Sequence, residues 1–258
     1  MLKKLDWVKV IIGLAVGIAL SEISITTITN ITRLYKKETR IVTKIIKVEE
    51  TKPTYNYLKS ITVLIKGKKP IVNESGKLTF RTVYLGTGVV IKVTDKYTYI
   101  LTNEHIANSK YVQFIQDKGE DVRAKIIKVS DLFDLGLLRI RGKLTDKRAV
   151  KGIALSIIGE KVYMVGHHLG IPFIYDTGNI SGYYGLNMIV SLPVMWGNSG
   201  SGVINKDGKL VGLIFALPVV FKNGFPVCDV AHGIAVDSIS IVSFLNSIPE
   251  LGNFSLIL

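Results

Sequence analysis

A succession of short strand-like segments constrains the fold of this chain most. From Lys59 onward, runs of β-branched, aliphatic and aromatic residues follow one another, and most end at Gly, Asp or Asn. Such runs, separated by turn residues, are typical of antiparallel strands. The runs are SITVLIKG, LTFRTVYLG, GVVIKVTD, YTYILTN, YVQFIQD, RAKIIKVS, LGLLRIRG, KVYMVG, NMIVSLPV, SGVINKDG, KLVGLIFALPVV and HGIAV. We therefore expect an all-β protein built as a barrel or a sandwich.

One helix is expected at the C-terminal end, in the segment DSISIVSFLNSIPEL. Asp237 is suited to cap its N-terminus. Ile239, Val242, Phe244 and Leu245 fall near one face at helical spacing, so we expect this face to pack on the core.

Composition limits the remaining classes. The chain has 258 residues, of which 48% are hydrophobic, so it can bury a core as one large β domain or two small ones. The single cysteine, Cys228, excludes an intrachain disulfide and is expected to be a small core residue. No Cys/His cluster indicates a metal site.

The net charge of +13 is compatible with an anionic partner, such as a nucleic acid or a membrane surface. The lysines are spread through the chain, however, without a basic block or a nucleic-acid-binding motif. Solvated surface charge therefore explains the composition better than specific nucleic-acid binding.

The N-terminal segment, residues 1–31, is hydrophobic. Its uncharged core, Val10–Leu20, is too short to span a bilayer alone and suits a signal peptide, whereas Trp7–Thr29 as one helix is long enough for an anchor. We expect membrane anchoring, or export if the segment is a cleaved signal; a buried soluble helix is the third alternative. Residues 32–57 are charged and are interpreted as a linker or stalk.

Three separate motifs hold the residue types that acyl transfer requires. YILTNEHIA places His105 just after a strand, where it is either a catalytic base or a solvated loop residue. DLFDLGLLRI places Asp134 directly before a strand, where it could orient an imidazole; Asp131 is a rival for this role. GNSGSG places Ser199 in a tight glycine turn, although Ser201 is also available.

The order His, Asp, Ser along the chain is that of chymotrypsin-like enzymes. Several motifs also resemble those of trypsin-like serine proteases of the HtrA (Deg) type, in the same order and across about residues 58–245. In the first half, GTGVVI resembles the family's GSGVII, YILTNEHIA resembles its YILTNNHV, and DLGLLRI resembles its DLAVLKI. In the second half, VGHHLG resembles IGNPFG, and DTGNISG resembles TSGIVS. GNSGSGVINKDGKLVGL resembles GNSGGALVNLNGELIGI, and GIAV resembles GFAI.

The resemblance implies a chymotrypsin-like double β-barrel with its active site between the barrels and no cofactor. By position, His105 would be the general base, Asp134 its orienting carboxylate and Ser199 the nucleophile. The amides of Gly197 and Ser199 would form the oxyanion hole.

The chain departs from the family pattern at three points. Ser201 replaces a glycine, and His167 and His168 stand where the family has Asn-Pro. For the two histidines, loop variation is a better explanation than a metal or second-base role. The chain stops soon after the C-terminal helix, so no PDZ domain is expected.

The resulting domain prediction is a hydrophobic segment at 1–31, a linker at 32–57 and a trypsin-like serine protease domain at 58–258. The predicted function is a serine endopeptidase acting on protein or peptide substrates. The alternatives are a catalytically silent protease fold that binds a partner at a membrane surface and a basic membrane- or nucleic-acid-binding protein.

The family alignment also predicts the specificity pocket. In trypsin-like enzymes the residue six before the nucleophile lies at the pocket base, which gives uncharged Pro193 here. The flanking strands would contribute Ile214, Phe215 and Ile234, and Gly233 would leave room for a side chain to enter. We therefore expect cleavage after small or medium apolar residues and poor cleavage after charged ones.

Overall fold

The computed structural model describes residue 33 and residues 53–73, 75–222 and 225–257. Lys52–Leu258 forms one compact unit, and the architecture below is that of this unit. The hydrophobic segment predicted at 1–31 lies outside the described residues. Within the described ranges, no helix has the length and apolar character needed to cross a membrane.

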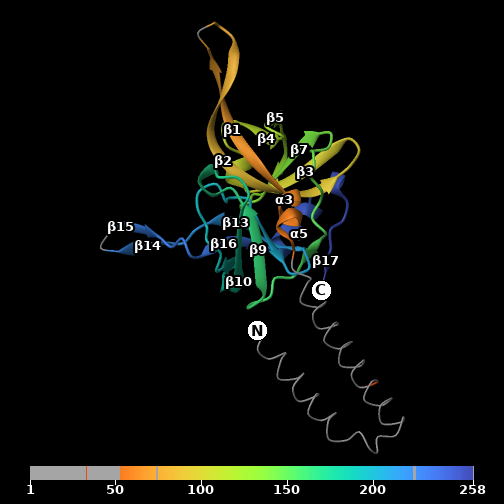
Figure 1. Ribbon diagram of the computed structural model, residues 1–258, viewed down its shortest axis with the longest axis vertical. Helices are drawn as coiled ribbons and strands as arrows, with labels where there is room; N and C mark the ends of the chain where they lie inside the picture. The colour runs from red at the N-terminus through yellow and green to blue at the C-terminus, as the bar shows by residue number, and fades with distance from the viewer. Residues whose placement is uncertain (1–32, 34–52, 74, 223–224, 258) are drawn as a thin grey trace, which may run out of the picture. The chain divides into compact units, whose positions relative to one another are not determined.

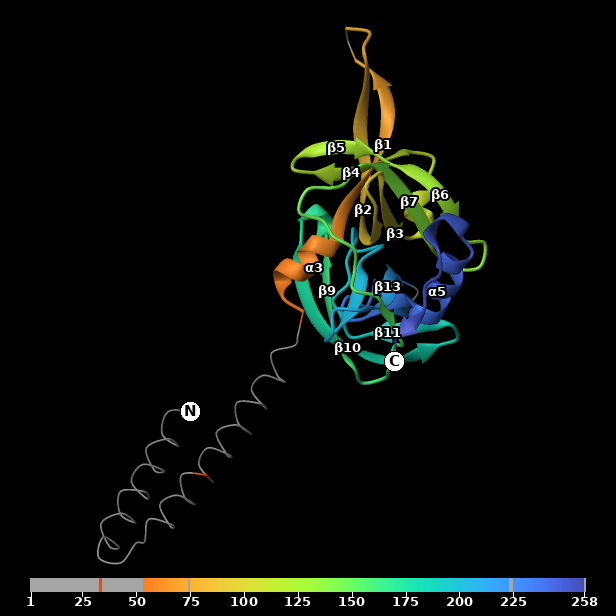
Figure 2. The ribbon, with the colours of Figure 1, turned by 90° about the vertical axis from the view of Figure 1, so that its right-hand side faces the viewer.

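The first barrel is an antiparallel sheet rolled up on itself (Figure 2). In the described part of the chain its strand order is β5-β4-β1-β2-β3-β7-β6. The edge strands β5 and β6 are joined by Ala124 alone, which brings the two ends of the sheet together. The strands are β1 (Thr62–Val72), β2 (Leu78–Val93), β3 (Tyr97–Thr102), β4 (Val112–Asp117), β5 (Glu120–Arg123), β6 (Lys125–Val129) and β7 (Gly136–Arg141).

The second barrel is closed by hydrogen bonds between its own strands. The order β12-β9-β10-β11-β16-β13 forms a ring because β12 also pairs with β13. Two short strands, β8 and β17, extend the sheet beyond β13. The strands are β8 (Ile153–Ala154), β9 (Lys161–Gly166), β10 (Ile174–Tyr184), β11 (Asn187–Val190), β12 (Gly202–Asn205), β13 (Leu210–Ala216), β16 (Gly233–Asp237) and β17 (Leu256–Ile257).

Two hairpins project from the barrels in Figure 1. One is the outer half of β1 and β2, and the other pairs β14 (Val219–Lys222) with β15 (Phe225–Cys228). Cys228 lies at the end of the second hairpin and is exposed. The prediction that Cys228 is a core residue is therefore wrong, because its strand extends away from the barrel.

Helix α3 (Tyr55–Ile61) precedes the first strand and begins within the segment predicted as a linker. The Thr54 hydroxyl accepts a hydrogen bond from the Tyr57 amide at 3.2 Å and caps the helix. The Tyr57 hydroxyl then donates to the carbonyl of Gly208 at 2.5 Å, which fastens α3 to the second barrel. The compact unit thus starts before residue 58.

The predicted C-terminal helix is α5 (Ser238–Asn246), and its cap is confirmed. The Asp237 carboxylate accepts from the Ser240 amide at 2.8 Å. Ile241, Phe244 and Leu245 are buried, but Ile239 is 57% exposed. The prediction for Ile239 is wrong because the helix starts directly at the end of β16, which turns Ile241 toward the core.

A shared core lies between the barrels and fixes the position of the functional site. This cluster contains Leu101 and Leu137 of the first barrel, Val165 and Leu213 of the second, and Phe244 of α5. Each barrel also has a core of its own. The all-β double barrel and the C-terminal helix predicted from the sequence are confirmed.

Candidate active site

His105 lies on a single helical turn, α4 (Glu104–Ala107), directly after β3. This turn sits close to the start of β7: a Cβ on Gly136 would lie 2.5 Å from the Ala107 methyl group. Glycine at position 136 therefore permits the approach of α4 to the loop before β7. The His105 side chain is 45% exposed.

Asp134 holds His105 at two points. One carboxylate oxygen lies 2.6 Å from His105 Nδ1, and the other accepts from the His105 amide at 3.0 Å. The Asn103 side chain donates to the Asp134 carbonyl at 2.9 Å and fixes the loop. Because an ionised carboxylate only accepts, Nδ1 carries the proton and Nε2 keeps a free lone pair. The structure joins Asp134, and not the exposed Asp131, to His105.

The turn around Ser199 depends on two glycines with positive φ, +98° at Gly197 and +87° at Gly200. A Cβ at Gly200 would collide with the Thr87 carbonyl, and one at Gly197 with the His167 carbonyl. The Thr87 amide donates to the Ser199 carbonyl at 2.8 Å. The backbone therefore approaches both barrels more closely than any other residue type would allow.

Ser201 points away from this turn. Its side chain is fully buried, and a Cβ on Gly166 of β9 would lie 2.5 Å from its hydroxyl oxygen. Ser199 is only half-buried. The structure thus separates the two serines that the sequence left as alternatives, with Ser201 inside the second barrel.

A cavity of about 520 Å³ brings His105 and Ser199 together. Its wall is largely apolar and includes Leu85, Leu169 and Trp196. Among the described residues, no hydrogen bond joins the Ser199 hydroxyl to the His105 ring. Such bonds between a nucleophile and its base are often long without substrate and shorten when it binds.

Two amides of the turn are free within the described chain. The amides of Asn198, Gly200 and Ser201 each donate to a backbone carbonyl, whereas those of Gly197 and Ser199 have no such acceptor there. The Trp196 carbonyl accepts from Leu169 at 2.7 Å, so the Gly197 N–H, on the other side of the same planar peptide, points away from that loop. These are the two donors predicted for an oxyanion hole.

His167 supports this turn through Thr87, a role that no sequence motif indicated. The Thr87 hydroxyl donates to the Gly197 carbonyl at 2.8 Å and lies 2.9 Å from His167 Nδ1. Since the hydroxyl proton is already used, His167 Nδ1 must be the donor in the second contact. The only signal in the sequence was the His-His pair at the family's Asn-Pro position.

The environment of His167 keeps its ring neutral. It is fully buried and packs edge-on against Phe173, with ring centroids 4.9 Å apart. Burial, with smaller contributions from the positive charge of Lys147 and from His168, lowers the pKa of His167 to about 3. His168 points elsewhere: its Nε2 lies 3.0 Å from an Asp176 oxygen on β10 but is not aligned for a hydrogen bond.

The residues predicted to form the specificity pocket are not among those that line the cavity with Ser199. Pro193 is exposed, while Ile214 is fully buried in the core of the second barrel. A Cβ on Gly233 would lie 2.5 Å from Val194 and 3.2 Å from Ile214. The space expected beside Gly233 is therefore filled. Phe215 and Ile234 are half-buried on neighbouring strands, and their role stays a prediction.

Comparison with known families identifies the part of the chain that carries this site. Residues 86–213 match the family described as the trypsin-like peptidase domain, and the match includes His105, Asp134 and Ser199. This region is a trypsin-like peptidase domain. The family predicted from the motifs is thereby confirmed.

Curated relatives and solved structures agree with this assignment. The chain is 28% identical over 176 residues to the "Serine protease HtrA-like" of Staphylococcus haemolyticus and 30% identical over 170 residues to that of Staphylococcus aureus. The matches cover 58% and 55% of this chain but only 28% and 22% of those proteins. The chain therefore matches less than a third of the length of these relatives.

Two solved structures share the fold. One is described as "HtrA-type protease AlgW with decapeptide", with a TM-score of 0.62, 18% identity, and coverage of 78% of this chain and 69% of that one. The other is the serine endoprotease from Yersinia pestis, with a TM-score of 0.57, 21% identity, and coverage of 78% and 68%. Both support the chymotrypsin-like double barrel.

Proposed function

We propose that this protein is a serine endopeptidase that hydrolyses peptide bonds through an acyl-enzyme. The observation that carries the proposal is the double contact of Asp134 with His105, on the wall of the cavity that Ser199 also lines. The trypsin-like family of residues 86–213 supports the same chemistry. A catalytically silent binding module would not need to hold the imidazole in one tautomer.

In the proposed reaction, His105 Nε2 takes the proton of the Ser199 hydroxyl as its oxygen attacks the scissile carbonyl. Asp134 stabilises the imidazolium that forms. The free amides of Gly197 and Ser199 donate to the oxyanion of the tetrahedral intermediate. The imidazolium then protonates the leaving amine, and water hydrolyses the acyl-enzyme by the same proton transfers.

We also propose that substrates present apolar side chains beside the scissile bond. Leu85, Leu169 and Trp196 line the cavity around Ser199, and none of the residues lining it is acidic. An apolar substrate side chain gains roughly 0.8 kcal/mol per buried methylene there, whereas an unpaired ammonium group loses its hydration. This agrees with the preference for small or medium apolar residues expected from the sequence.

Labelling with a fluorophosphonate tests the proposed chemistry, because this probe modifies only an activated serine. Wild-type protein should be labelled, and Ser199→Ala should abolish labelling and lower peptidase activity by roughly 3 to 6 orders of magnitude. Ser201→Ala is the matched control and should keep its label, since that hydroxyl is buried beside Gly166. An unlabelled wild type, or a label lost only in Ser201→Ala, would contradict the proposal.

The hydrophobic segment at 1–31 supports a second proposal, that the protein is attached to a membrane or exported. Full-length protein should sediment with membranes and resist carbonate extraction, and a chain beginning at Lys52 should not. Full-length protein that keeps its N-terminus and remains in the supernatant without detergent would contradict both anchor and signal.

A further inference from the structure

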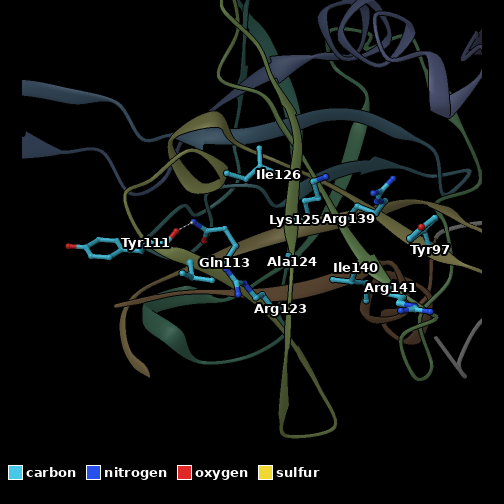
Figure 3. A pocket seen from close by; sticks show the side chains of 11 residues that line it. Tyr97, Tyr111, Gln113, Arg123, Ala124, Lys125, Ile126, Arg139, Ile140 and Arg141 are labelled. Atoms are coloured by element: carbon cyan, nitrogen blue, oxygen red, sulfur yellow. Dashed lines mark hydrogen bonds between the residues drawn. The ribbon is translucent and has the colours of Figure 1, made fainter. Parts of the chain in front are cut away.

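A second cavity, of about 640 Å³, lies on the first barrel where β5 passes into β6 at Ala124 (Figure 3). We call it the basic groove, because four of its lining side chains are cationic and none is acidic. The cations are Arg123, Lys125, Arg139 and Arg141. Figure 3 shows them distributed around the strand at Ala124, with Lys125 and Arg139 next to each other.

The pairing register of β6 and β7 places several of these positive charges next to one another. Lys125 is the direct cross-strand partner of Arg139, and Arg141 follows two residues later on the same face of β7. Like charges at opposed positions of an antiparallel pair are destabilising. Arg139 is offset by Glu250 at 3.0 Å, but within the described residues Arg123, Lys125 and Arg141 form no ion pair. A bound anion would offset this repulsion.

The rest of the groove favours a carboxylate-bearing polypeptide over a nucleic acid. A cation already occupies one face of each of its tyrosines: Arg139 lies 4.2 Å from the Tyr97 ring centroid, and Lys110 lies 5.4 Å from that of Tyr111. Stacked bases need open aromatic faces. The groove instead offers aliphatic surface at Val112 and Ile126, against which an extended peptide can place apolar side chains.

Tyr111 connects the basic groove to the candidate active site. Tyr111 is a lining residue both of the groove and of the cavity that contains His105 and Ser199. A polypeptide lying in the active-site cavity can therefore continue past Tyr111 into the groove. We propose that the basic groove binds an acidic segment of the polypeptide substrate, at a distance from the scissile bond. This inference rests on the proposed peptidase function for the identity of the ligand as a substrate.

Binding can be measured without cleavage. The full-length Ser199→Ala protein is titrated against a fluorescein-labelled peptide of Glu-Ala repeats, and binding is followed by fluorescence anisotropy at low and moderate salt. The test variant adds Arg123→Gln, Lys125→Gln and Arg141→Gln, and leaves Arg139 in place because it pairs with Glu250 and packs on Tyr97. The control variant instead adds Lys77→Gln, Lys161→Gln and Lys206→Gln. These three lysines are exposed and lie outside the groove, so their substitution removes the same amount of positive charge.

The test variant should bind the peptide about tenfold more weakly or worse, and should depend less on salt, because three exposed charge contacts are lost. The control variant should keep the affinity, and the Gln-Ala version of the peptide should not bind to any of the proteins. Equal weakening in both variants would overturn the groove as the site. Tighter binding of oligothymidylate than of the acidic peptide, with the same loss in the test variant, would overturn the choice of ligand.

The same variants distinguish this inference from the proposed function. In protein that retains Ser199, the three groove substitutions should raise KM for a substrate with an acidic extension. They should leave kcat and fluorophosphonate labelling unchanged. Peptide binding in the groove without labelling of Ser199 would overturn the enzyme assignment, and with it the identity of the ligand as a substrate, but not the groove as a binding site for acidic peptides. Labelling without groove binding would overturn only the groove.

Discussion

Two histidines, one from each barrel, lie on either side of the Ser199 turn and have opposite surroundings. His105 follows β3 of the first barrel, is 45% exposed and faces a carboxylate. His167 follows β9 of the second barrel, is fully buried and faces a hydroxyl and the Phe173 ring. The two imidazole rings therefore differ both in solvent exposure and in the group that each contacts.

The difference shows how burial and partner decide what a histidine does. A carboxylate beside a half-exposed ring stabilises the imidazolium, which suits His105 to accept a proton in the proposed reaction. Burial without a neighbouring carboxylate disfavours the protonated, charged ring, so His167 stays neutral and donates a hydrogen bond from Nδ1 to Thr87. Through Thr87, it positions the Gly197 carbonyl and hence the turn; it is a positioning residue and not a base.

Removing each histidine side chain in turn should affect activity most strongly at His105. His105→Ala should lower kcat by roughly 3 to 6 orders of magnitude, because the base is lost, and should change stability by less than about 0.5 kcal/mol. His167→Ala should lower kcat by only about 10- to 100-fold, through displacement of the turn, and should cost about 2 to 4 kcal/mol of stability. Kinetics and urea unfolding on both variants separate the two roles. If folded His167→Ala were as inactive as His105→Ala, the assignment of His167 would be wrong.

A smaller effect is expected from the partner of the base. Asp134→Asn should keep the fold but lower kcat by about 2 to 4 orders of magnitude, because a carboxamide no longer favours the Nδ1–H tautomer of His105. Asp131→Asn is the matched control three residues earlier and should retain nearly full activity, since Asp131 is exposed and does not bond to His105. Comparable losses in both variants would contradict the choice of Asp134.

A change of pH tests whether the buried His167 ring stays neutral in the folded protein, and its effect is expected on stability alone. The pKa of His167 is about 3 in the folded protein and ordinarily 6.5, so the unfolded chain binds this proton first as pH falls. The neutral His167 ring therefore contributes fully to the free energy of unfolding above pH 6.5. This contribution is lost progressively as the pH falls toward 3, to a limit of about 4 to 5 kcal/mol.

Urea unfolding at several pH values between 4 and 7 measures this loss. His167→Asn keeps a side-chain donor without a titrating ring, as in the family's own sequence pattern, and should flatten the pH dependence. An equally steep loss in wild type and His167→Asn would show that His167 does not stay neutral in the folded state.

Much of the fold could be predicted from strand patterns alone, and the failures have physical causes. LTFRTVYLG and GVVIKVTD are parts of one strand, β2, which continues through Gly86 and Gly88 because Ile106 and Ile100 pack against them. Strand β10 was not predicted, since its segment contains Asp176, Gly178 and Asn179. Pairing with β9 on one side and β11 on the other makes it a strand despite its composition.

The amino-acid sequence alone indicated the residue types of the candidate site, which are a histidine, an aspartate and a serine in order. It also contained the glycines of a tight turn and the charge and hydrophobic patterns of the strands. The folded structure was needed to show that Asp134, and not Asp131, contacts His105, and that Ser201 is buried while Ser199 lines the cavity, because the direction of a side chain depends on the packing around it. The contact of His167 with Thr87 and the basic groove also became visible only in the folded chain. Both arise from contacts between residues far apart in the chain, Thr87 with His167 and Lys125 with Arg139, which no local pattern encodes.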